Sequence, residues 1–168
     1  MNESKKEIWV VLYDTMPDSL CLVSKAFELS EQRGFVCRAV YLAPALASED
    51  SMLLAQAGAE RITHIPIKDY SSNCEYEIRN CLTDAIIREK PYAVLFISSI
   101  FSSAVAPGVA ALLKVGITAD CTQLYWDEKG NLIQSRPTYG GRAQANILSQ
   151  TIPVIATVRR GIFRLNKR

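Results

Sequence analysis

The sequence has a single histidine, His64, and no two cysteines in the C-x-x-C spacing. Its cysteines are odd in number: Cys21, Cys37, Cys74, Cys81 and Cys121. Zinc sites are built from closely spaced cysteines and histidines, and disulfide frameworks usually contain an even number of cysteines. We therefore expect no metal site and no disulfides. Idle thiols of this kind are typical of a reducing compartment, so we expect a cytoplasmic protein.

Long hydrophobic runs are also missing. The first apolar run, residues 8–13, stops at Asp14 and is too short for the core of a signal peptide. No stretch approaches the roughly 18 apolar residues that a membrane-spanning helix needs. The sequence thus predicts no export signal and no membrane span.

Neither sign of charge is in marked excess. The 19 Lys and Arg residues against 17 Asp and Glu residues give a net charge of +2, which provides no general attraction to nucleic acid. The basic residues that gather near the C-terminus are Arg159, Arg160, Arg164, Lys167 and Arg168. We expect residues 1–163 to form the domain, and residues 164–168 to be a solvated tail or the start of a linker.

Signatures of common enzymes are absent from the sequence. It contains no G-x-G-x-x-G, no phosphate loop of the G-x-x-x-x-G-K-[ST] type, no H-E-x-x-H and no G-x-S-x-G. His64 lies inside a predicted strand rather than at a strand end, and no nucleophile is evident beside it. We therefore predict no catalytic residues.

What the sequence does contain is the pattern of one globular domain. With 168 residues, 49% of them hydrophobic, the chain is long enough to bury a substantial core without staples. Short apolar runs predict strands at residues 8–13, 35–42, 61–67 and 92–98. Amphipathic runs predict helices at residues 19–33, capped by Asp18, at 49–57, at 75–89, and from about 104–107 to Gly116. Nearly continuous apolar strands that alternate with helices indicate a parallel sheet covered on both faces.

The pattern changes after Gly116. Residues 117–126, 131–136, 142–149 and 154–158 are predicted strands, with no room for helices between them. The turns at 127–130 and 139–141 contain glycine and are typical of hairpins. The predicted fold class is therefore α/β, with a doubly wound, mainly parallel sheet flanked by helices and an antiparallel extension after Gly116.

Two groups of polar residues follow predicted strands at the carboxyl edge of the sheet. Asp14 ends the first strand, and Ser98 and Ser99 end the fourth and lead into a helix. Open α/β folds bind ligands at this edge, and a helix N-terminus favours phosphate. These residues are candidates for a nucleotide site. Alternatively, Asp14 caps a turn and a serine caps the helix.

A second group is polar where a core strand would be apolar. By the two-residue period of a strand, Thr118, Asp120 and Thr122 share one face. Arg136 or Arg159 can approach Asp120 if the following strands pair in order. We expect a partly buried polar junction or an interface, in which the threonine hydroxyls also bind the carboxylate. The alternative is an edge strand with one wet face.

Three motifs in this region carry a family resemblance. They are G-I-T-A-D-C-T at 116–122, R-P-T-Y-G-G at 136–141 and A-T-V-R-R-G-I-F at 156–163. Their order and spacing resemble the N-terminal domain of the electron-transfer flavoprotein α subunit. The strong resemblance covers residues 116–163. It departs at residues 102–108, where the family often has basic residues and this chain has none, and at Arg142, where asparagine is usual.

The resemblance implies a role in electron transfer. Family members are α/β heterodimers that carry electrons on FAD from dehydrogenases to an acceptor. In the family, FAD is held mainly by a C-terminal α domain, which we expect to lie outside these 168 residues, so stoichiometric FAD is not expected here. Two groups of residues are therefore candidates for contacts at the junction with that domain or with the β subunit, the first from the resemblance and the second mainly from the strand spacing described above. The first could contact the cofactor: Arg136, Tyr139, Gly140 and Gly141. The second would form the interface or polar junction: Thr118, Asp120, Thr122, Arg142 and Arg159.

Two functions therefore remain open. The first is a non-catalytic, partner-binding domain of a flavoprotein electron carrier. The second is a small adenine-nucleotide-binding module, of the kind found in universal stress proteins, that uses Asp14, Ser98 and Ser99. The extension at 116–163 favours the first, because a separate nucleotide module does not need it.

Overall fold

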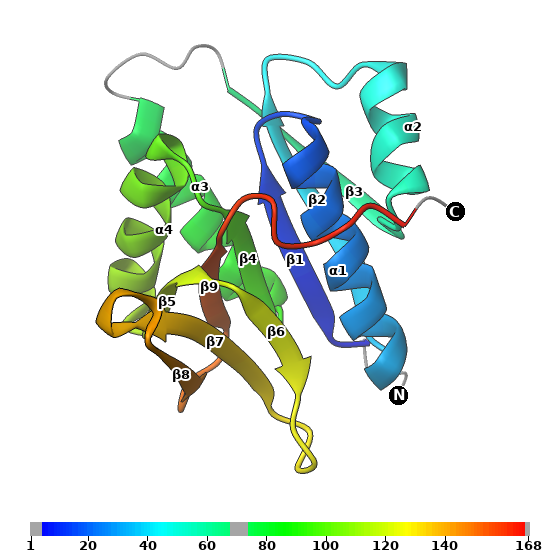
Figure 1. Cartoon of the computed structure of the whole chain (residues 1–168). Helices are drawn as coiled ribbons and strands as arrows, with labels where there is room; N and C mark the ends of the chain where they lie inside the picture. The colour runs from blue at the N-terminus through cyan, green and yellow to red at the C-terminus, as the bar shows by residue number, and fades with distance from the viewer. Residues whose placement is uncertain (1–4, 68–73, 167–168) are drawn as a thin grey trace.

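A six-stranded parallel sheet forms the centre of the computed structural model, which describes residues 5–67 and 74–166 (Figure 1). The strand order is β3-β2-β1-β4-β9-β5, and every neighbouring pair is parallel. The strands are β1 (Glu7–Leu12), β2 (Val36–Ala43), β3 (Arg61–Pro66), β4 (Ala93–Ile97), β5 (Ile117–Cys121) and β9 (Val154–Val158). The order reverses between β1 and β4, which makes the sheet doubly wound, as predicted.

Two pairs of helices cover the two faces of this sheet. They are α1 (Pro17–Arg33) and α2 (Ser48–Gln56) on one face, and α3 (Cys74–Glu89) and α4 (Ile100–Leu113) on the other (Figure 1). Residues of β1 alternate between the two cores: Val10 packs on the α1 side and Trp9 on the α3 side. Every residue of β1 is buried, because both of its faces are covered.

A three-stranded antiparallel sheet completes the layer on the α1 side. It consists of β6 (Gln123–Trp126), β7 (Leu132–Thr138) and β8 (Ala143–Leu148), with β7 in the middle. Leu124 and Leu132 join the same core cluster as Leu95 and Ala156 of the main sheet. The small sheet thus covers strands for which the sequence supplies no helix on this face.

An aromatic group fixes the small sheet to the rest of the domain. Trp126 donates a hydrogen bond from Nε1 to the carbonyl of Leu29, at 3.0 Å. Its ring lies 5.7 Å from the ring of Phe35 and 5.5 Å from that of Tyr92. The hairpin beyond Trp126 is closed by Asp127, whose carboxylate accepts hydrogen bonds from the backbone and side-chain nitrogens of Asn131.

The antiparallel part is smaller than predicted, which corrects the expectation for the chain after Gly116. The predicted strand at 117–126 is two strands, β5 and β6, in different sheets. Its direction changes at Asp120, which has a positive φ of 60°, and the register of β5 against β9 shifts between Thr118 and Cys121. Strand β9 inserts between β4 and β5 as a parallel strand. Only β6, β7 and β8 are antiparallel.

Three helix ends also differ from the prediction. Helix α4 begins at Ile100, where Ser99 and Ser102 form a capping box, so Pro107 lies inside the helix rather than in its first turn. The helix ends at Lys114 in a left-handed conformation, before Gly116. Asp18 does not cap α1: the helix starts at Pro17, without a side-chain cap on Met16.

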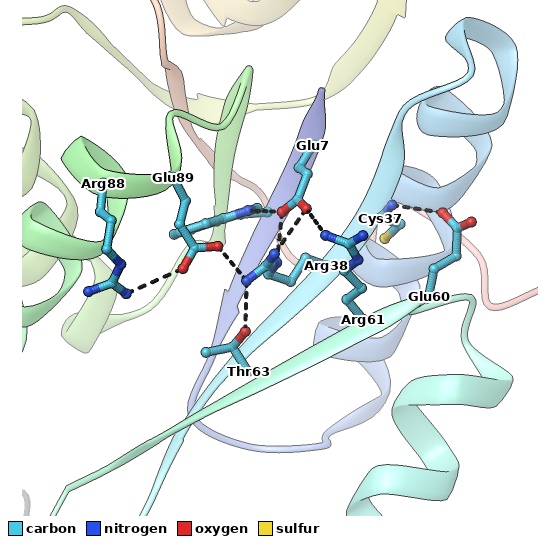
Figure 2. Close-up of polar contacts among 9 residues, drawn as sticks. Glu7, Cys37, Arg38, Glu60, Arg61, Thr63, Arg88 and Glu89 are labelled. Atoms are coloured by element: carbon cyan, nitrogen blue, oxygen red, sulfur yellow. Dashed lines mark hydrogen bonds and ion pairs between the residues drawn. The ribbon is translucent and has the colours of Figure 1, made fainter. Parts of the chain in front are cut away.

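A network of charges joins the beginnings of the first three strands to the end of α3 (Figure 2). Glu7 accepts hydrogen bonds from Arg38 at 2.9 Å, from Arg61 at 2.7 Å and from Trp9 at 2.7 Å. Arg38 also forms an ion pair with Glu89 at 2.7 Å. The side chains of Glu7 and Arg38 are only 11% exposed. This network lies at the amino edge of the sheet and leaves the opposite edge free for a site.

Candidate functional site

The carboxyl edge of the main sheet carries two hollows. The first has a volume of about 570 Å³ and lies where β1 and β4 diverge. It is lined by Tyr13, Cys74, Glu75, Ser99, Ile100, Phe101 and Arg160. The rings of Tyr13 and Phe101 pack at a centroid distance of 4.8 Å and form its apolar part. Sheets of this type bind ligands at such a position.

The residues predicted for a nucleotide site are largely occupied with local structure. Asp14 accepts hydrogen bonds from the backbone of Met16 at 3.1 Å and from the Ser19 hydroxyl at 2.6 Å. Ser99 caps α4, and the backbone N–H of Ser98 donates to the carbonyl of Val158. Among Asp14, Ser98 and Ser99, Ser99 alone lines the first hollow. This geometry matches the capping roles that were the alternative for these residues.

The second hollow has a volume of about 590 Å³ and lies between the end of β7 and the end of β9. It is lined by Arg136, Pro137, Thr138, Tyr139, Gly140, Gly141 and Arg159. The structure therefore brings together the four residues proposed to lie near the cofactor. It also adds an arginine that the sequence assigned to the polar junction.

A short 3-10 turn, η1 (Tyr139–Gly141), forms the rim of the second hollow. All three of its residues have positive φ angles, 49°, 65° and 87°. Two glycines adopt this conformation readily, but Tyr139 adopts it with strain. The Tyr139 side chain is 84% exposed. Its large ring therefore lies at the surface, where another molecule can contact it.

Asp120 pairs with Arg159, one of the two partners expected from the sequence. Nε of Arg159 lies 3.1 Å from Oδ1 and 3.2 Å from Oδ2 of the carboxylate. The hydrogen bond from Arg159 lowers the pKa of the Asp120 carboxyl group, and the charges of Arg159 and Arg136 lower it further. The Asp120 and Arg159 side chains are 44% and 45% exposed. The pair is therefore much more exposed than the partly buried junction that we expected.

The two threonines do not bind Asp120, which corrects the prediction of one shared polar face. Thr118 donates to the amide oxygen of Gln134 at 3.0 Å, inside the protein. Thr122 donates to the carbonyl of Ser135 and accepts from Gln144. The positive φ of Asp120 breaks the two-residue alternation on which that prediction depended. Thr118 instead links the main sheet to the small sheet.

Arg142 stands apart from both hollows. It follows η1, its backbone N–H donates to the carbonyl of Tyr139 at 3.3 Å, and its side chain is exposed. It is therefore available to a partner.

Strand β8 was predicted as a strand at residues 142–149, but its exposure on both faces was not expected. It forms an edge of the small sheet, with β7 on one side. None of its residues is buried, although Ala143, Ala145, Ile147 and Leu148 are apolar. Its alternating pattern looks like that of any half-buried strand, so the pattern does not reveal that both of its faces are accessible.

The residues after β9 run back across α1 (Figure 1, red). Asp18 accepts hydrogen bonds from the Arg160 side chain at 3.1 Å and from the Gly161 backbone at 3.0 Å. Phe163 and Leu165 pack against the core on the α1 side. The chain as far as residue 166 is therefore attached to the domain, whereas Lys167 and Arg168 of the predicted tail lie outside the described residues.

The cysteines and the histidine form no evident reactive centre. Cys37 and Cys121 are buried and free, and burial raises the pKa of the Cys121 thiol to about 12. His64 makes a 2.8 Å hydrogen bond between its Nε2 and the carbonyl of Ala43. Within residues 5–67 and 74–166, no group of three or more His, Cys, Asp or Glu side chains is arranged to hold a metal. None of the helices described there has the length and hydrophobicity that a membrane crossing requires.

Fold and site together define a class: a doubly wound α/β domain with a small antiparallel sheet and two hollows at its carboxyl edge. Comparison with known families gives a more specific result. Residues 13–168 match the electron transfer flavoprotein domain, so the chain belongs to this family. Its relatives include α subunits of electron-transfer flavoproteins, as the sequence motifs indicated.

Two relatives illustrate the match. The chain is 30% identical over 161 residues to the LctC subunit of lactate dehydrogenase (NAD(+),ferredoxin) from Acetobacterium woodii, with 90% of this chain and 36% of the relative covered. It is 33% identical over 155 residues to the electron transfer flavoprotein α subunit of Clostridium acetobutylicum, with 86% and 44% covered. The chain thus spans less than half the length of each.

A solved structure supports the fold alone. UDP-GlcNAc 2-epimerase from Neisseria meningitidis aligns with a TM-score of 0.51 at 17% identity, over 64% of this chain and 30% of the epimerase. At this identity the likeness concerns the α/β architecture and carries no information on function.

Proposed function

We propose that this chain is a non-catalytic, partner-binding domain of a flavoprotein electron carrier that passes electrons from a dehydrogenase to an acceptor. Family membership supports the electron-transfer role. Its partners would be the β subunit of the carrier and the flavin-binding domain of the α subunit. The relatives are more than twice as long as the matched region, which leaves room for such a domain in them.

The observation that carries this proposal is the exposure of β8. An edge strand with apolar residues and unpaired backbone groups is prone to unwanted association, and natural proteins usually cover it. The Leu148 side chain is 44% exposed, and Ala143 is exposed at the other end of the strand. A partner that packs on β8 would bury these side chains and could also reach Tyr139 and Arg142 in the adjacent turn.

FAD fits this chain only in part. When bound, FAD supplies the redox chemistry of the carrier. Arg136, Arg159 and the Tyr139–Gly141 turn offer positive charge and an exposed ring to an edge of such a cofactor. The same residues cannot enclose a ring system, because the Tyr139 side chain at the rim is largely in solvent. We propose that these residues face the flavin-binding domain and that the isolated chain purifies without flavin absorbance. A spectrum with about one equivalent of flavin would place the cofactor in this domain.

A binding experiment tests the partner role. The chain is mixed with the β subunit of the same organism, and complex formation is measured by analytical ultracentrifugation. Leu148→Asp would place a charge on β8 and should weaken the complex at least about tenfold. Met52→Asp is the matched control, because Met52 is 56% exposed on α2, away from β8. Equal affinity of the wild-type and Leu148→Asp chains would overturn the proposed surface.

A second candidate function depends on the first hollow. Tyr13, Phe101 and Arg160 give it two aromatic rings and a positive charge, which suit an adenine nucleotide. Asp14 and Ser98 do not line it, so the sequence-based form of this hypothesis has lost two of its three residues. A cytoplasmic location stays a prediction, supported by the fact that no disulfide joins any of the five cysteines, all of which lie in the described part of the chain.

A further inference from the structure

We propose that the second hollow is an oxyanion site, which binds a phosphate group or a carboxylate between Arg136, Arg159 and the Tyr139–Gly141 turn. All of these residues belong to this chain, so the site does not need a partner. It holds whether or not β8 packs against a partner.

The first feature of this hollow is the side chain of Arg136. Its Nε is shielded from solvent and has no hydrogen-bond partner among the residues that the structure describes. Burying a donor of a charged group without a partner is unfavourable, because the group loses its water and gains nothing in return. Arg136 also lines the hollow, so an oxyanion bound there would balance the positive charge of its guanidinium group. Guanidinium groups are well suited to this, since their planar fork matches carboxylate and phosphate oxygens.

The second feature of this hollow is the side chain of Arg159. It binds the carboxylate of Asp120 through Nε and Nη2. A guanidinium group has five N–H donors, so this contact leaves donors over while the arginine side chain is held in place. The hollow thus already contains one carboxylate–arginine pair at its edge. Two arginines against one aspartate leave a positive charge to be balanced.

The third feature of this hollow is the backbone of the Tyr139–Gly141 turn. Tyr139, Gly140 and Gly141 form a tight turn with positive φ angles, and successive backbone N–H groups of turns can bind an anion. A Cβ placed on Gly140 or Gly141 would meet no atom within 4 Å, so the space beside both glycines is open. A ligand can therefore approach the backbone closely there.

Nuclear magnetic resonance of the ¹⁵N-labelled chain tests the site with two probes, inorganic phosphate and acetate, at constant ionic strength. We expect saturable shifts of the Arg136 Nε–H and of the Gly140 and Gly141 amides with at least one probe. The probe that saturates at lower concentration identifies the class, phosphate or carboxylate. Shifts that rise linearly with both probes would overturn the proposal.

Three variants make the test specific. Arg136→Gln should weaken binding at least about tenfold, because it removes the charge. Asp120→Asn should strengthen it, since it frees Arg159 and removes a negative charge. Arg160→Gln is the control, because Arg160 pairs with Asp18 and does not line this hollow. Unchanged affinity of Arg136→Gln, with a native melting temperature, would place the bound anion elsewhere and overturn the proposal.

Discussion

Arg159 holds the carboxylate of Asp120 with two of its nitrogen atoms, and in doing so it connects the end of β9 to the neighbouring strand β5. The backbone N–H of Asp120 is held as well, by the Thr157 hydroxyl of β9 at 2.9 Å. These contacts stabilise the one residue of β5 that has a positive φ. The pair therefore belongs to the place where the chain leaves the main sheet for the small one.

Removal of this ion pair should have little effect on stability. Both side chains are nearly half exposed, and exposed pairs contribute little because water and salt screen them. We expect the melting temperature of Asp120→Ala to lie within about two degrees of wild type. A loss of roughly ten degrees would contradict the exposed position of this ion pair.

The pair should also be visible in an acid titration. Because Arg159 lowers the pKa of Asp120 in the folded state, the stabilisation is fully present above the unfolded pKa of about 4. It is lost as the pH falls through the lowered folded pKa. The Asp120 carboxyl carbon should titrate below its ordinary range, and Arg159→Gln should raise that midpoint. An equal titration midpoint of Asp120 in the wild-type and Arg159→Gln proteins would contradict the hydrogen bond between Arg159 and Asp120.

Disruption of the charge network at the amino edge, in contrast to that of the Asp120–Arg159 pair, should lower the melting temperature markedly. Arg38→Met leaves Glu7 buried with Arg61 as its remaining arginine, and Glu89 without its ion pair to Arg38 (Figure 2). The loss of one member of a buried ionic network costs about 3–5 kcal/mol, or roughly 10 °C in melting temperature at this size. Arg88→Met is the control, because Arg88 is 72% exposed and contacts Glu89 from outside. Equal melting temperatures would show that the network is not important for stability.

The main sheet was predictable because its signals are local. Apolar runs, helical periodicity and glycine at helix ends gave the first four strands and the helices between them, and residues 154–158 were predicted without error. The position of β9 was not predictable, because it depends on pairing with β4, about 60 residues away. The division of residues 117–126 depends on the backbone of Asp120, and no turn residue such as glycine marks it.

The residues that line the second hollow were predictable from the sequence, whereas the hydrogen bonds around it were less so. Arg136, Tyr139, Gly140 and Gly141 meet in one hollow because a hairpin turn keeps them close in sequence and in space. The bond between Thr118 and Gln134 was missed, since Gln134 reads as a polar residue on a strand and gives no sign that it is completely buried. Long-range polar contacts of this kind leave no periodic signal.

Calorimetry separates the electron-carrier function from the nucleotide module. We expect AMP and ATP to bind no more tightly than about millimolar, roughly −4 kcal/mol, because Asp14 and Ser99 are engaged in local hydrogen bonds. Micromolar affinity that disappears on Tyr13→Ala would favour the nucleotide module. Tyr13 is the better probe than Asp14, since it lines the first hollow.

Hydrogen exchange on the complex with the β subunit tests most directly whether β8 packs against another subunit or domain, as proposed. In the isolated chain the outward-facing amides of residues 143–148 should exchange rapidly, because β8 pairs with β7 on one side. In the complex they should be protected, while the hairpin turn at residues 127–130 stays unchanged. Formation of the complex without added protection of β8 would contradict the claim.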